Sequence, residues 1–153
     1  AVVRALGDEA PAAASRLPKL RPAVSEILIA DAARRAGVVA AAPLAAIDMP
    51  VITLIQLRLT TQLAVVHDRT LGPERAAELA PVLIGGYAWR ALSRLAQVRL
   101  PAPAALVRGA LASAVTLAIG AGAEAWFSSG RAPGSLDELR GAVEGAVRRR
   151  AAS

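Results

Sequence analysis

Residues 36–55 read AGVVAAAPLAAIDMPVITLI, a stretch in which Asp48 is the one charged residue. Its length suits a membrane-spanning helix, which needs about 20 predominantly apolar residues. Pro43 and Pro50 divide the stretch, and a proline inside a helix removes a backbone hydrogen bond and clashes with the preceding turn. The sequence here therefore predicts two helices joined by a tight connection, and not one straight helix.

The helices on either side of this connection have recognisable patterns. The first is expected to begin near Pro22 and to end near residue 42. The helix after Pro50 carries apolar residues at spacings of three and four, namely Ile52, Ile55, Leu59 and Leu63. A polar strip beside them contains Thr53, Gln56 and Thr60. This pattern predicts a half-buried helix.

Prolines and glycines divide the remaining sequence into further helices. We expect a helix that begins at Pro73, one over residues 82–98, and a long apolar one over 104–127. Ser135 and Glu138 have the spacing of a capping box that opens a C-terminal helix. In the long apolar helix, small residues recur every four positions at Ala110, Ala114, Ala118 and Gly122. Small residues at this spacing predict the close approach of a second helix.

Composition points to the same fold class. Hydrophobic residues make up 55% of the chain, with alanine prominent among them, and aromatic residues only 3%. Alanine is the best helix former, whereas strands favour β-branched and aromatic side chains. We therefore predict an all-α, alanine-rich bundle of about five to six helices. The expected organisation is a linker or N-terminal arm over 1–22, a helical domain over 23–128, and a flexible joint with an amphipathic C-terminal helix over 129–153.

Charge and motif content limit the chemistry that this chain can perform. The formal net charge is +6, and there is no cysteine, which excludes disulfides and thiolate metal sites. The sequence contains no phosphate-binding loop, no G-x-S-x-G and no H-E-x-x-H motif. The basic residues are scattered among acidic ones without interleaved aromatics, which disfavours nucleic acid as a partner. We predict no catalytic residue, no cofactor and no metal.

Three ionisable residues deserve individual interpretation. His67 lies at a predicted helix end, where a cation interacts favourably with the helix dipole; a catalytic or ligand role is the alternative. Asp48 is predicted to cap the helix that Met49 and Pro50 begin, the alternative being a functional contact in apolar surroundings. Glu124 is expected to pair with an arginine, Arg58 or Arg108. An enzyme built on Asp48 and Glu124 is disfavoured because no nucleophile or metal set accompanies them.

Hydropathy does not decide whether the apolar helices of this chain contact a membrane. Residues 36–55 and 109–123 form either a hydrophobic hairpin that enters a bilayer or the buried centre of a soluble bundle. Trp126 and Phe127 suit a membrane interface or the edge of a core equally. The C-terminal cluster Arg148, Arg149 and Arg150 is a candidate contact for anionic lipid head groups, the alternative being a solvated helix end.

Several spaced motifs resemble an uncharacterised bacterial helical domain of the YcjF type. They lie within AAAPLAAIDMPVITLIQLRL (40–59), LGPERAAELAPVLIGGYAWRALSRLAQVRLP (71–101) and VTLAIGAGAEAWF (115–127). The matching features, in order, are Asp48 and Pro50, Gln56 and Arg58, Pro73 to Arg75, Gly85 and Gly86 with Arg90, and Thr116 with Gly120. The resemblance covers about residues 20–128.

This resemblance implies association with an Era-like GTPase domain, in the same or a separate chain. It also implies a place in the bacterial cytoplasm or on the cytoplasmic face of the inner membrane, and it implies no catalytic residues. The functional hypothesis is a non-catalytic, GTPase-associated helical domain that mediates membrane or protein-partner association. The alternative is a soluble structural or oligomerisation bundle without a membrane role. The candidate structural or partner-contact residues are Asp48, Pro50, Gln56, Arg58, Arg75, Gly85, Gly86, Arg90 and Glu124.

Overall fold

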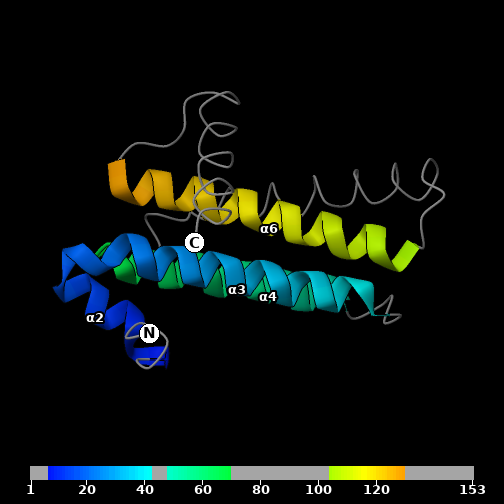
Figure 1. The fold of residues 1–153 in the computed structure, drawn as a ribbon, viewed down its shortest axis with the longest axis horizontal. Coiled ribbons are helices and arrows are strands. Elements are labelled where there is room, and N and C mark those ends of the chain that lie inside the picture. Colours follow the sequence, from blue (N-terminus) through cyan, green and yellow to red (C-terminus); the bar gives the residue numbers. More distant parts are fainter. Residues whose placement is uncertain (1–6, 43–47, 70–103, 130–153) are drawn as a thin grey trace.

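The computed structural model describes residues 7–42, 48–69 and 104–129 (Figure 1). Within these ranges the chain is helical apart from short turns and contains no strand, which confirms the all-α prediction. In chain order the elements are η1 (Gly7–Glu9), α2 (Ala10–Arg16), η2 (Pro18–Leu20), α3 (Arg21–Ala41), α4 (Asp48–Val66) and α6 (Ala104–Ser129).

The boundary between α3 and α4 lies where the prolines predict it. Ala42 follows α3 in an extended conformation with φ −66° and ψ 145°. Steric contact with a following proline favours this conformation, and Pro43 comes next in the sequence. Pro50 lies in the first turn of α4, where its missing N–H has no helical acceptor. The prediction of two helices in residues 36–55 is therefore confirmed.

The N-terminal residues form more structure than the sequence predicts. Residues 8–22 contain three prolines and suggest a linker with at most a short helical turn. Instead, Pro11 lies in the first turn of α2, and Pro18 begins η2. Ala10 and Ala14 on α2 pack with Val24 of α3 and Val66 of α4 in a small apolar cluster. The prolines here therefore begin helices and do not interrupt them.

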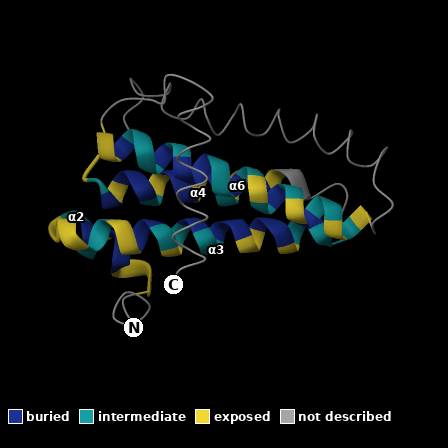
Figure 2. Cartoon of the chain, turned by 45° about the horizontal axis from the view of Figure 1, so that its top comes forward, coloured by how far each residue is buried: buried dark blue, intermediate teal, exposed yellow. Residues whose placement is uncertain are grey.

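The three long helices pack side by side. Figure 1 shows α3 and α4 lying along each other, with α6 crossing above the pair. The buried faces of the three helices turn toward one another in Figure 2. At one end the core contains larger side chains, including Ile29, Leu59, Leu63 and Phe127. Toward the other end the core contains mainly alanine, so the helices can approach more closely there.

Glycine makes the closest of these contacts possible. A Cβ atom added at Gly109 on α6 would lie 2.9 Å from the carbonyl oxygen of Gly37 on α3. A Cβ atom added at Gly37 would collide with the hydroxyl of Ser113, which itself donates a hydrogen bond of 2.9 Å to the carbonyl oxygen of Ala33. Small residues of this kind allow two helix backbones to come together.

The small-residue face of α6 lies elsewhere than predicted. Ala110 and Ala114 are exposed, and Ala118 and Gly122 are only partly buried. The buried face instead contains Gly109, Ala112, Thr116, Ile119, Gly120, Ala121, Ala123 and Phe127. The prediction of close packing along 110–114–118–122 was therefore wrong. Small residues occur all around α6, so their spacing alone does not select the packing face.

Candidate functional site

A buried polar contact joins α4 to α6. The Gln56 side chain is 2% exposed, and its Nε2 donates a hydrogen bond of 3.2 Å to Oγ1 of Thr116, which is 0% exposed. One turn further along α4, the Thr60 hydroxyl donates to the carbonyl oxygen of Gln56. The polar strip of α4 thus includes two side chains that lie inside the bundle. Periodicity located this strip but did not reveal that a partner on α6 buries it.

Gly120 lies one turn after Thr116 on the same face of α6. A Cβ atom there would lie 2.8 Å from the side chain of Ile29 and 3.2 Å from that of Leu59. Gln56, Thr116 and Gly120, which all contribute to the family resemblance, therefore lie together where α3, α4 and α6 meet. In this structure these three positions pack helices against one another.

Arg58 occupies a different environment from Gln56, two residues before it. Its side chain is 64% exposed, and Nη2 lies 3.3 Å from Oδ1 of Asp8, which is 93% exposed. The predicted pair between Arg58 and Glu124 is therefore wrong. Two residues along an α-helix correspond to a turn of about 200°, which places the neighbouring motif residues on nearly opposite faces of α4.

Glu124 pairs with histidine. Its Oε2 lies 2.9 Å from Nε2 of His67, immediately after the end of α4, and the two side chains are 23% and 7% exposed. The ring of Phe127 lies against the imidazole, with centroids 6.4 Å apart. His67 is thus at a helix end, as predicted, but its partner is a carboxylate that lies 57 positions away in sequence. Sequence spacing carries no signal for such a contact.

Arg108 could not have been the partner of Glu124. Both residues are on α6, sixteen positions apart, which corresponds to about 24 Å along a helix. Within the described part of the chain, Nε of Arg108 is buried without a hydrogen-bond partner. Among those same residues, no group of three His, Cys, Asp or Glu side chains could hold a metal ion.

The other predicted site residues are placed only in part. Asp48 is the first residue of α4, and Pro50 in the same turn is exposed. The helix begins one residue earlier than predicted, and the side chain of Asp48 is outside the described structure, so its role as a cap stays a prediction. Arg75, Gly85, Gly86, Arg90, Arg148, Arg149 and Arg150 also lie outside the described residues.

The polarity of α6 is the reverse of that expected for the surface helix of a soluble bundle. Residues 109–123 carry no charge, and the exposed positions Leu106, Ala110 and Ala114 are apolar. The polar side chains of Ser113 and Thr116 make contacts with α3 and α4. Surface helices of soluble proteins normally place polar residues outward. Between residues 106 and 123 the exposed positions of α6 are therefore apolar, whereas Ser128 and Ser129 at the end of the helix are exposed and polar.

By length and composition, α6 is the one described helix that could cross a membrane, and about a third of its most apolar 18-residue window is buried. Helices α3 and α4 meet α6 through small residues and through hydrogen bonds between helices. These are also the contacts that join helices within bilayers.

The described chain is an all-α helical module whose long helices pack through alanine, glycine and a buried amide. It belongs to the family described as Domain of unknown function (DUF697), whose family model matches residues 9–150. That match extends into all three segments that the sequence predicts as arm, helical domain and C-terminal helix. No curated protein and no solved structure matches the chain.

Proposed function

We propose that this chain is a non-catalytic helical module that associates with a membrane through the outer surface of α6. The observation that carries this proposal is the polarity of α6 between residues 106 and 123, where the exposed side chains are apolar and the hydroxyls of Ser113 and Thr116 contact α3 and α4. Burial of apolar surface away from water is favourable and needs no charge on the membrane. Alanine and leucine on the outer surface supply that area, and the uncharged length from 109 to 123 lets the helix enter the hydrocarbon region.

The proposed partner is an Era-like GTPase domain, in the same or a separate chain. The support for this partner is the resemblance to the YcjF-type domain over about residues 20–128. In this arrangement the G domain performs nucleotide chemistry, and the helical module holds it at the cytoplasmic face of a bacterial inner membrane. The missing phosphate-binding loop supports a division of labour of this kind.

Vesicle flotation tests the membrane proposal. The purified chain is mixed with vesicles containing phosphatidylglycerol and centrifuged through a density gradient at high salt, which screens surface charge. We expect the wild-type chain to float. The double variant Leu106→Glu/Ala114→Glu places two carboxylates on the outer surface of α6 and should remain at the bottom.

A matched variant controls for added charge. Leu54→Glu/Thr61→Glu places two carboxylates at exposed positions of α4 and should float like the wild type. Equal loss of flotation in both variants would contradict the assignment of the membrane surface to α6. A wild-type chain that stays at the bottom and is monodisperse without detergent would favour the alternative, a soluble structural or oligomerisation bundle.

A further inference from the structure

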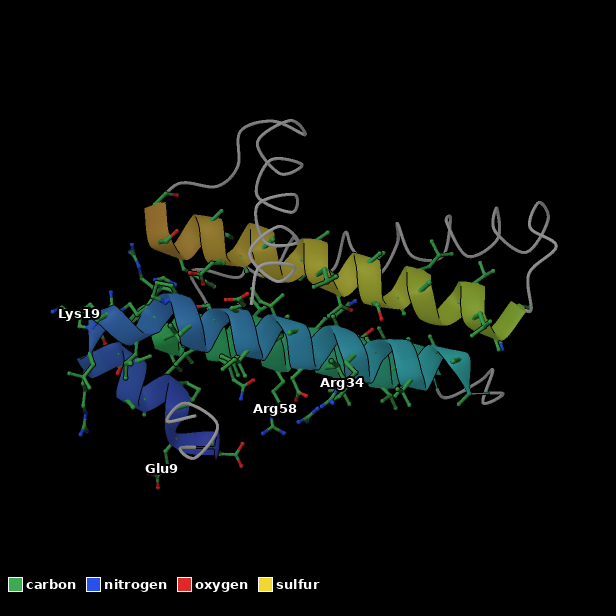
Figure 3. All side chains as sticks on the ribbon, viewed as in Figure 1. Glu9, Lys19, Arg34 and Arg58 are labelled. Carbon is green, nitrogen blue, oxygen red and sulfur yellow. The ribbon has the colours of Figure 1, made fainter. Side chains whose placement is uncertain are left out.

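A groove runs between α3 and α4 on the side of the pair away from α6. It has a volume of about 850 Å³ and is lined by residues of η1, α2, α3 and α4, with no described residue of α6 among them. Figure 3 shows the labelled side chains of Arg34 and Arg58 extending from the pair on the side opposite α6. The groove and the outer surface of α6 are therefore separate surfaces of the molecule.

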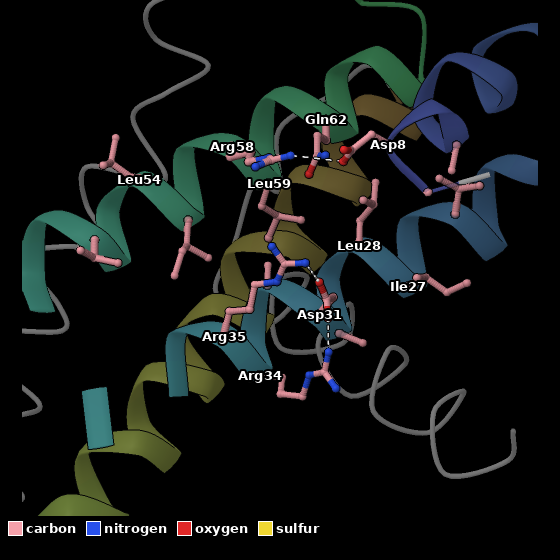
Figure 4. Close-up of a pocket in the computed structure, with 17 residues that line it drawn as sticks. Asp8, Ile27, Leu28, Asp31, Arg34, Arg35, Leu54, Arg58, Leu59 and Gln62 are labelled. Atoms are coloured by element: carbon pink, nitrogen blue, oxygen red, sulfur yellow. Dashed lines mark hydrogen bonds and ion pairs between the residues drawn. The ribbon is translucent and has the colours of Figure 1, made fainter. Parts of the chain in front are cut away.

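The floor of the groove is apolar. Leu28 from α3 and Leu59 from α4 lie at its base, and Ile27 and Leu54 lie at its edges (Figure 4). Ile55 of α4 also lines the groove. Ile27 is 36% exposed and Leu54 is 63% exposed, which is high for large aliphatic side chains. Exposed apolar surface bordered by polar residues is typical of an interaction site.

Arginines lie on both sides of the groove. Arg34 and Arg35 come from α3 and Arg58 from α4, and their side chains are 73%, 61% and 64% exposed. Two carboxylates offset part of the charge of these three cations. Asp31 is shared by Arg34 and Arg35, and Asp8 contacts Arg58 from the end of the groove. The groove therefore has an excess positive charge, and each guanidinium keeps donors for a further carboxylate.

On the side opposite the groove, α3 and α4 already pack against a helix, namely α6. There α6 lies along α3 and α4 and buries apolar side chains of both. Laying the apolar face of an amphipathic helix into a groove between two helices is a common mode of peptide recognition. The excess positive charge along the two sides of the groove favours a ligand with carboxylates beside its apolar stripe.

We infer that the groove between α3 and α4 is a docking site for an acidic amphipathic helix of a protein partner. Apolar residues of the partner cover Leu28, Leu54 and Ile55, and aspartates or glutamates on its flanks meet Arg34, Arg35 and Arg58. This inference deepens the partner-binding part of the proposed function. It does not depend on α6 entering a membrane.

The test uses the whole 153-residue chain and designed peptides. One fluorescein-labelled, 18-residue amphipathic peptide carries a leucine stripe flanked by glutamates, and a second carries the same stripe flanked by lysines. Fluorescence anisotropy in a fixed mild detergent measures both affinities. We expect the glutamate peptide to bind at least tenfold more tightly than the lysine peptide, and the difference to shrink at high salt.

Two exposed leucines provide matched variants. Leu54→Glu in the groove should weaken binding of the glutamate peptide at least tenfold, as should the charge reversal Arg58→Glu. Leu106→Glu, on the outer surface of α6 and 66% exposed in the wild type, should leave the affinity unchanged. Circular dichroism of each variant establishes that the helices are retained.

Several outcomes would overturn the inference. The first is equal binding of the two peptides, and the second is loss of binding in Leu106→Glu but not in Leu54→Glu. Flotation separates this site from the proposed membrane function. If Leu54→Glu abolished vesicle binding while peptide binding was absent throughout, the groove would be a lipid site and not a protein-docking site.

Discussion

At the scale of single residues, Gln56 and Thr116 show how a polar side chain is accommodated inside an alanine-rich bundle. The amide is buried, and Nε2 donates to the threonine hydroxyl across the interface between α4 and α6. A buried donor that loses its acceptor costs more than the bond itself contributes, because the group remains desolvated. The two residues are therefore best changed together.

Thr116→Val removes the acceptor while keeping nearly the same side-chain volume. We expect the free energy of unfolding to fall by about 1–3 kcal/mol, the usual penalty for an unsatisfied buried group. Urea titration followed by circular dichroism measures it. The control is Thr61→Val, at an exposed position whose hydroxyl bonds only within α4, where a change within about 0.5 kcal/mol is expected. The double variant Gln56→Leu/Thr116→Val should regain part of the loss; a further drop would contradict this interpretation.

His67 and Glu124 make a second residue-scale prediction. Glu124→Leu leaves the nearly buried imidazole without its carboxylate and should reduce the free energy of unfolding by about 1–3 kcal/mol. Glu124→Gln keeps an acceptor oxygen at the same place and should lose less. Thermal melts of the two variants, compared at one pH, distinguish them. Equal stability of the leucine and glutamine variants would show that the contact contributes little.

At the scale of elements, the boundary between α3 and α4 and the buried stripe of α4, with Ile52, Leu59 and Leu63, were predictable, whereas the helices before residue 21 and the packing face of α6 were not. Pro43 follows the end of α3, Pro50 lies in the first turn of α4, and Pro103 precedes α6, because proline acts on the local backbone. The packing face of α6 depends on which neighbour it meets, and small residues are available on several sides. For the same reason the sequence identified Glu124 and His67 as unusual but did not predict that they form a pair.

The close contact between α3 and α6 predicts how a larger side chain at Gly109 would change the stability of the bundle. Gly109→Val would force the two backbones apart at Gly37, and overpacking of this kind typically costs about 1–3 kcal/mol. Valine has a better helix propensity than glycine by a few tenths of a kcal/mol, so a net loss of about 1–2 kcal/mol is expected. Ala110→Val adds bulk at the next, exposed position and should change stability by less than about 0.5 kcal/mol. Chemical denaturation of the two variants would refute the packing if Ala110→Val proved the more damaging.

At the scale of the whole molecule, two surfaces face in different directions. The apolar outer surface of α6 is on one side of the α3–α4 pair, and the arginine-lined groove is on the other. The proposed membrane surface and the proposed docking groove therefore do not overlap. Composition alone did not predict this arrangement, because the hydropathy of α6 is also that of a buried core helix.

The C-terminal arginines supply a further prediction for the intact chain. Arg148, Arg149 and Arg150 are expected to add a salt-sensitive part to vesicle binding, since a basic residue near an anionic surface contributes about 1 kcal/mol. Replacing all three by Gln should weaken flotation at low salt and leave it unchanged at high salt. Flotation at two ionic strengths with the same phosphatidylglycerol vesicles measures both parts. A loss at high salt equal to that at low salt would contradict an electrostatic role.

The hydrogen bond between Gln56 and Thr116 also fixes the alignment of α6 along its neighbours. Where the core contains mainly alanine, the shape of the interface alone distinguishes poorly between one lengthwise position of α6 and the next. Sliding α6 by one turn would move Thr116 by about 5.4 Å and leave the amide of Gln56 without an acceptor. A bundle in which α6 is shifted along its neighbours would therefore contain a buried amide donor without an acceptor, which the native packing avoids. Together with the contacts of Ser113 with Ala33 and of Glu124 with His67, this polar contact favours a single register for α6.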